Sequence, residues 1–175
     1  MKLQGKIKKQ VFLGFLVSLA LVLYLVEAML PNPFPLPGAK LGLANLVTLL
    51  TLMLFGLKEG LFVALLRVLL GTILSGTFTG PVFIISLSAA LVSTLSMSLF
   101  LGWKDIFSPI SVSIIGAISH NLTQLLVVSF LIGTFNIYFY LPVLLIIAIP
   151  VGTSTGYIAS LVKRYLDNFY KSSSG

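Results

Sequence analysis

The sequence has no cysteine, which excludes disulfide bonds and thiolate chemistry. Charge is scarce as well: Asp, Glu, Lys and Arg make up 9% of the 175 residues, against about 25% in an ordinary soluble domain. So few charged side chains would not cover the surface of a soluble protein of this size. By contrast, 58% of the residues are hydrophobic. Composition therefore predicts a membrane protein.

Several kinds of catalytic machinery are missing from the chain. No Gly-x4-Gly-Lys-Ser/Thr sequence is present, so the chain does not hydrolyse ATP through a P-loop. The single histidine makes zinc or copper ligation unfavourable. An aspartate-rich Mg²⁺–diphosphate site needs clustered carboxylates. The chain has four acids, far apart in sequence: Glu27, Glu59, Asp105 and Asp167. We therefore predict no catalytic residues, no metal site and no cofactor.

Long uncharged stretches set the number of membrane crossings. Residues 106–162 carry no charged side chain and would form a helix about 85 Å long. Because a bilayer core is about 30 Å thick, this stretch must cross at least twice, as must residues 68–103. We predict an all-α polytopic protein with one transmembrane domain over residues 1–175, a bundle of six transmembrane helices, and a disordered tail at about 171–175. The predicted helices span residues 11–30, 41–57, 60–75, 82–103, 108–132 and 138–162.

Basic residues predict the orientation of the bundle. With both termini in the cytoplasm, the outer loops hold only Lys40, as the positive-inside rule requires. The inner segments then hold Lys2, Lys6, Lys8, Lys9, Lys58, Lys104, Lys163, Arg164 and Lys171. We expect a multi-pass protein of the cell (plasma) membrane. Topology accounts for the net charge of +7, so no nucleic-acid partner is expected. The first apolar run lacks a small-x-small cleavage site, and we interpret it as a retained helix.

Polar residues inside predicted helices are candidates for function, because burying them in a membrane is costly. Arg67 lies near the middle of the third helix, with Glu27 as its expected partner; the pair forms either a site for a substrate anion or a structural ion pair. His120 and Gln124 share one face of the fifth helix, and Asn121 adjoins it. These three side chains either line a ligand site or form hydrogen bonds between helices.

Two further features allow two interpretations each. Prolines stiffen the first outer loop, residues 31–40, which is either a lid over an outward-facing cavity, with Lys40 and Asn45 at its rim, or a rigid connector. Gly14 and Ser18 form a small-xxx-small pair on the first helix, which favours close approach of another helix. That helix belongs either to the same bundle or to a partner protein.

Several blocks of sequence resemble a known family. Residues 35–49, PLPGAKLGLANLVTL, are similar to a block of the Gx transporter family, which is also labelled heptaprenyl diphosphate synthase component I. Residues 57–59, 65–71 and 119–125 are similar to its other blocks, and the resemblance spans about residues 11–160. The family resembles the substrate-binding S-components of energy-coupling-factor (ECF) transporters. This implies six helices and, as partners, a transmembrane coupling subunit and two ATPases. Where S-components contact the coupling subunit through Ala-x-x-x-Ala, this chain has Gly14 and Ser18.

Two functions follow from these observations. The leading hypothesis is the substrate-binding membrane subunit of a small-molecule importer of the ECF type, embedded in the lipid bilayer, with an unknown substrate. The alternative, which the second family label implies, is a non-catalytic membrane partner of a heptaprenyl diphosphate synthase or of a quinone-linked system, binding an isoprenoid. In both, the candidate substrate-binding residues are Glu27, Lys40, Asn45, Arg67, His120, Asn121 and Gln124. Gly14 and Ser18 are the candidate partner-binding residues.

Overall fold

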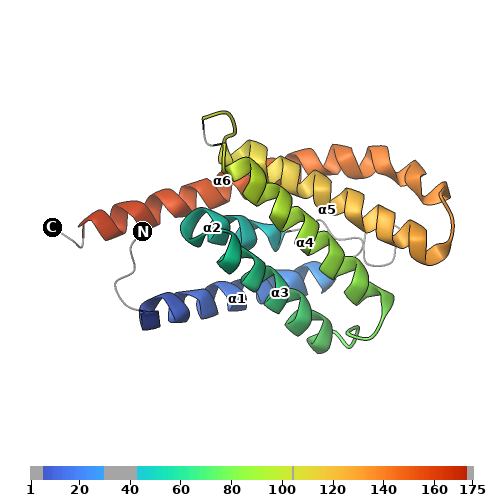
Figure 1. Cartoon of the computed structure of the whole chain (residues 1–175), viewed down its shortest axis with the longest axis horizontal. Coiled ribbons are helices and arrows are strands. Elements are labelled where there is room, and N and C mark those ends of the chain that lie inside the picture. The colour runs from blue at the N-terminus through green and yellow to red at the C-terminus, as the bar shows by residue number, and fades with distance from the viewer. Residues whose placement is uncertain (1–5, 30–42, 104, 173–175) are drawn as a thin grey trace.

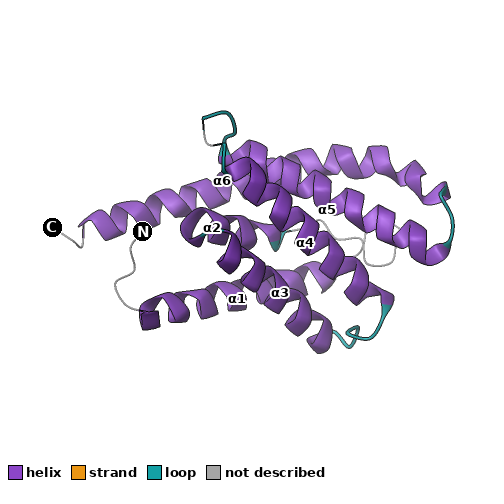
Figure 2. Ribbon diagram, viewed as in Figure 1, coloured by secondary structure: helices purple, strands orange, loops and turns teal. Residues whose placement is uncertain are grey.

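The computed structural model describes residues 6–29, 43–103 and 105–172. These residues form six α-helices and one short 3-10 helix, which confirms the predicted all-α class (Figure 2). The helices are α1 Lys6–Met29, α2 Asn45–Phe55, α3 Leu57–Leu74, α4 Pro81–Leu101, α5 Pro109–Ile132, the 3-10 helix η1 Asn136–Tyr140 and α6 Leu141–Ser172.

Four of the described helical segments are long and apolar enough to cross a bilayer. They are Ile7–Met29, Pro81–Leu101, Pro109–Ile132 and Asn136–Phe169. Large apolar side chains on these segments face outward: Phe15, Ile84 and Phe130 are all exposed. Contact between so much apolar surface and water would be unfavourable, whereas the acyl chains of a bilayer solvate it. The chain is therefore an integral membrane protein.

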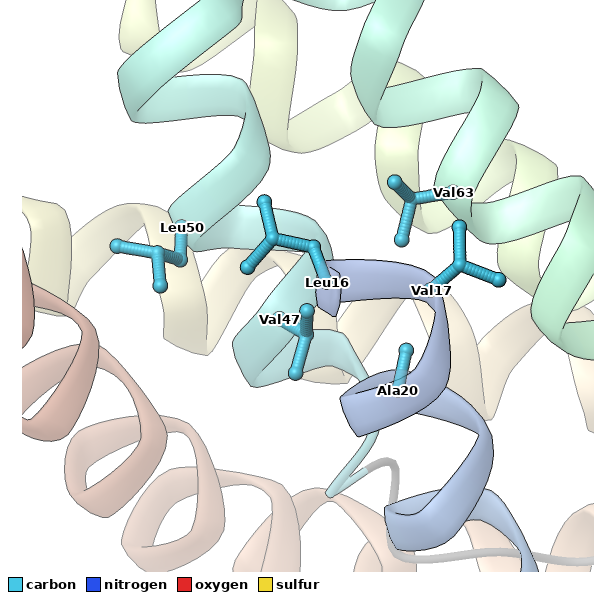
Figure 3. Close-up of a cluster of buried hydrophobic side chains, with 6 residues drawn as sticks. All are labelled: Leu16, Val17, Ala20, Val47, Leu50 and Val63. Atoms are coloured by element: carbon cyan, nitrogen blue, oxygen red, sulfur yellow. The ribbon is translucent and has the colours of Figure 1, made fainter. Parts of the chain in front are cut away.

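The start of α1, the α2–α3 turn and the C-terminal part of α6 lie at the same end of the bundle (Figure 1). The first two are joined by a cluster of buried apolar side chains, shown in Figure 3. Leu16, Val17 and Ala20 of α1 meet Val47 and Leu50 of α2 and Val63 of α3 there. Val162 of α6 packs at the edge of this cluster. This core fixes α2 and α3 against α1.

The second helix is shorter than the sequence suggests. A helix is expected over residues 41–57, but α2 has 11 residues and begins at Asn45. It ends at Phe55, and the next residue, Gly56, has a φ of 94° and turns the chain directly into α3. Glycine adopts this left-handed conformation without the clash that a Cβ would cause. At 11 residues, α2 is about 16 Å long, roughly half the thickness of the bilayer core.

The last helix is longer than the sequence suggests. We place its end at residue 162 from hydropathy, whereas α6 continues to Ser172, and residues 173–175 lie outside the described part. Lys163 and Asp167 form an ion pair one turn apart on this extension, which favours helix. The charged residues after 162 end the apolar stretch that can cross the membrane, but the helix itself continues through them. Pro150 lies inside α6, and the helix is continuous through it.

Lys9 ties the start of α1 to the α2–α3 turn. Its ammonium forms a short hydrogen-bonded ion pair with Glu59 and lies 5.7 Å from the centre of the Phe55 ring. The hydrogen bond from Lys9 lowers the pKa of Glu59, an effect that partial desolvation opposes.

We expect this ion pair to lose its contribution to stability in acid. Glu59 has a folded pKa below its ordinary value of 4.5, so the contribution is present above that value and lost as pH falls through the folded pKa. Because both side chains are partly exposed, Glu59→Gln should cost about 1 kcal/mol or less near neutral pH. Thermal unfolding of both proteins as the pH is lowered should show this difference vanish. Asp105→Asn, at an exposed loop position, is the control, and a difference that stays constant with pH would contradict the assignment.

Candidate functional site

The most deeply buried cation of the described part is Arg67 of α3, whose side chain is 3% exposed. Its Nη2 atom donates a hydrogen bond of 2.8 Å to Oδ1 of Asn45, the first residue of α2. Asn45 is buried as well. The sequence names Asn45 only as a rim residue of the outer loop and expects Glu27 as the partner of Arg67. The structure adds Asn45 as a direct partner.

α1 brings an acid and a phenol to the same place. Glu27 and Tyr24 both lie close enough to Arg67 to act on its charge. The ring of Tyr24 packs on Gly71 of α3, where an added Cβ would come within 2.3 Å of the ring. Gly71 follows Arg67 by one helical turn, so this contact holds the Tyr24–Glu27 turn of α1 beside Arg67. The structure thus places three helices around one buried charge.

Several donor atoms of this site have no hydrogen-bond partner. They are Nε of Arg67, Nδ2 of Asn45 and Oγ1 of Thr48, and all three belong to buried side chains. Buried donors are normally paired, so each such atom needs an explanation. Thr48 and Tyr24 are not among the residues predicted from the sequence. Spacing was the available signal: Thr48 follows Asn45 by three residues, and Tyr24 precedes Glu27 by three.

The second group of candidates lies on α5. His120, Asn121 and Gln124 are all buried. Asn121 donates from Nδ2 to the backbone carbonyl of Leu144 on α6, at 3.1 Å. This bond between helices is what the structural interpretation of the polar trio expects. Arg67 and Asn45 thus join α3 to α2, and Asn121 joins α5 to α6.

The remaining candidates are placed as follows. Lys40 lies outside the described residues. Gly14 and Ser18 are exposed on the outer face of α1, where the Ser18 hydroxyl donates to the Gly14 carbonyl of its own helix, at 3.0 Å. A Cβ added at Gly14 would meet no atom within 4 Å. The small pair thus faces away from the bundle, and its role in binding a partner stays a prediction.

Acidic side chains stand apart from one another in the described part of the chain. Glu27 is buried on α1, Glu59 pairs with Lys9, Asp167 pairs with Lys163, and Asp105 is exposed between α4 and α5. Among these residues no three His, Asp or Glu side chains gather in a way that could hold a metal ion.

A bundle of apolar helices that encloses buried polar side chains defines the chain as a polytopic membrane protein with an internal polar site. The chain belongs to the family described as heptaprenyl diphosphate synthase component I, whose model matches residues 16–162. This confirms the family named from the sequence. No curated protein and no solved structure matched the chain. The resemblance to ECF S-components stays a prediction.

Proposed function

We propose that this protein is a non-catalytic membrane partner of a heptaprenyl diphosphate synthase and that its helical bundle binds an isoprenoid. The observation that carries the proposal is the family match over residues 16–162, in a chain with four apolar helices of membrane-spanning length. A component of a synthase that is itself embedded in the bilayer suits a reaction whose product grows more apolar with each added unit.

The chemistry of prenyl transfer assigns different roles to the two proposed subunits. Elongation needs Mg²⁺ ions held on clustered carboxylates, which bind the diphosphate. The four acids of this chain are dispersed, and two of them, Glu59 and Asp167, are engaged by lysines. In the proposal, the carboxylates come from a separate catalytic subunit. This chain supplies the apolar surroundings for the prenyl tail.

The proposal includes six helices with both termini in the cytoplasm. The start of α1 and the end of α6 lie at the same end of the bundle, which supports an even number of crossings (Figure 1). Lys9, Lys58, Lys163 and Arg164 belong to this end, and the positive-inside rule places it in the cytoplasm. In this arrangement α2 covers the inner half of the second crossing, and α3 forms the third.

The second candidate function is the substrate-binding subunit of an importer. The burial of His120, Asn121 and Gln124 on one helix favours it, since a water-soluble substrate needs polar partners inside the bundle. In this role Lys40 would join the site from the outer loop, and the exposed Gly14–Ser18 pair would contact a transmembrane coupling subunit that acts with ATPases.

Purification of the tagged full-length chain from its native membrane separates the two functions. We expect a soluble prenyl diphosphate synthase subunit to co-purify, and mass spectrometry of the sample to detect a prenyl chain. Another multi-pass protein with the same tag, purified in parallel, controls for lipids that bind any apolar helix. Recovery of ATPase subunits together with a water-soluble ligand would refute the proposal in favour of the importer.

A further inference from the structure

Together with Arg67, the first turn of α2 has the composition of a binding site for an anion. We propose that Arg67, Asn45, Thr48 and the N-terminus of α2 bind the phosphate or diphosphate group of an amphiphile, at about half the depth of the membrane. The choice of a prenyl tail rests on the proposed function. The anion site itself rests on the donors described below.

The depth of the site follows from helix lengths. α2 has 11 residues, so Asn45 lies about 15 Å from the turn at Gly56. α2 ends at Phe55 and α3 begins at Leu57. Counted from these two ends at the turn, Asn45 and Arg67 lie the same number of residues away. The two residues therefore reach the same level, and the 2.8 Å bond between them closes the hairpin there. With a bilayer core about 30 Å thick, this level is close to the midplane.

A helix that begins at this depth presents its positive end there, although the N–H of Leu46 already donates to the carbonyl of Leu43, at 3.1 Å. The first backbone N–H groups of an α-helix have no partner within the helix, and the helix dipole adds partial positive charge at this end. The residue before α2 is Ala44, which gives no side-chain cap. Half-helices that begin inside a membrane protein commonly point this end at an anionic group.

Side chains supply independent evidence for an anion at this place. The unpaired atoms, Arg67 Nε, Asn45 Nδ2 and Thr48 Oγ1, are all able to donate, and the first two are donors only. Each belongs to a side chain that is at most 6% exposed. Thr48 lies one turn after Asn45 on α2, so its hydroxyl is on the same face. These three donors lack acceptors, and an oxygen-rich group would provide them.

The charges and surroundings of the site select the ligand class. Arg67 and the helix dipole are positive, and Glu27 offsets part of this charge. A guanidinium favours phosphoryl groups, whose several oxygens accept paired hydrogen bonds. Buried apolar residues neighbour the donors along the chain: Val47 precedes Thr48, Val68 follows Arg67, and Val63 lies one turn before Arg67. A phosphate or diphosphate ester with a hydrocarbon tail matches both the hydrogen-bond donors and the apolar side chains.

Binding to the purified full-length chain in detergent tests this inference. The probes are farnesyl diphosphate, farnesol and inorganic pyrophosphate, measured by isothermal titration calorimetry. We expect farnesyl diphosphate to bind most tightly, pyrophosphate to bind more weakly, and farnesol to show no binding at the site. Arg67→Met should weaken farnesyl diphosphate binding about 100-fold, the loss expected for charge-assisted hydrogen bonds. Arg164→Met removes an exposed cation of α6 and should leave the affinity unchanged.

Two further variants keep the test decisive if Arg67→Met fails to fold. Thr48→Val keeps the side-chain size and should weaken binding about 10-fold by removing one hydrogen bond. Glu27→Gln removes the opposing charge and should strengthen it. Equal affinity for farnesol and farnesyl diphosphate, or unchanged affinity in Thr48→Val, would overturn the anion site; equal affinity for pyrophosphate and farnesyl diphosphate would overturn the amphiphile. Neither result depends on co-purification of a synthase, so the two proposals can fail separately.

Discussion

Substitution of Gly152 by alanine should destabilise the protein by about 3 kcal/mol or prevent its folding, at the upper end of what overpacking costs. Gly152 of α6 packs directly on the backbone of α5. A Cβ there would lie 2.6 Å from the Cα and 3.0 Å from the backbone N of Ile114. Backbone atoms inside a helix have no rotamer by which to move away, so the helices must separate. Gly156 makes the same kind of approach, 2.7 Å from the Cα of Ile110.

Gly14→Ala is the matched control for this prediction. It also replaces a glycine within an apolar helix, but no atom lies within 4 Å of the added methyl group. Alanine favours helix over glycine by up to about 1 kcal/mol, so this variant should unfold at the wild-type temperature or above it. Thermal unfolding in detergent, followed by circular dichroism, compares the variants. Equal stability of Gly152→Ala and the wild type would mean that α5 and α6 do not pack this closely.

Substitution of Asn45 by leucine should be the second most damaging change. The variant keeps the branched shape of the side chain but removes the acceptor from Nη2 of Arg67. Arg67 is 3% exposed and would then keep its charge in an apolar interior with one partner fewer. Removing a hydrogen-bond partner of a buried charged group typically costs about 1.5–3 kcal/mol. We expect a corresponding fall in unfolding temperature or in the yield of folded protein.

A double variant shows whether the loss of stability in Asn45→Leu comes from the charge of Arg67. Arg67→Met combined with Asn45→Leu removes the charge together with its hydrogen-bond acceptor, while Glu27 stays beside the site. The loss of stability in the double variant should therefore be smaller than the sum of the losses in the two single variants. If the two substitutions add instead, Asn45 and Arg67 do not act as a pair.

Hydropathy predicted the long helices because a membrane crossing needs a minimum length of apolar sequence. The segments 82–103 and 108–132 correspond closely to α4 and α5. The half-length of α2 was not predictable in this way, since residues 41–57 carry no charged side chain and hydropathy does not record where a helix begins. The extension of α6 beyond residue 162 was missed for a related reason: the charged residues after it favour helix in water as well.

The candidate site was predictable in its residues but only partly in its contacts. Arg67, Glu27 and Asn121 stand out because a polar side chain in an apolar run needs a partner. Which partner it finds depends on the depth at which helices begin. The 11-residue length of α2 brings Asn45 level with Arg67, and this places Thr48 in the same group. The contact between Asn121 and the Leu144 carbonyl involves a backbone atom, which no side-chain pattern reveals.

The length of α6 has a consequence for a soluble partner. Its 32 residues measure about 48 Å, against about 30 Å for the hydrocarbon region. A stalk of roughly 18 Å therefore stands outside the lipid tails, beyond the level of the other helices (Figure 1). It carries Tyr165, an exposed aromatic side chain, next to Arg164. In the proposed orientation, an enzyme held on this stalk would work within one protein diameter of the inner leaflet, so that a lengthening hydrocarbon chain could enter the bilayer without being released into the cytosol.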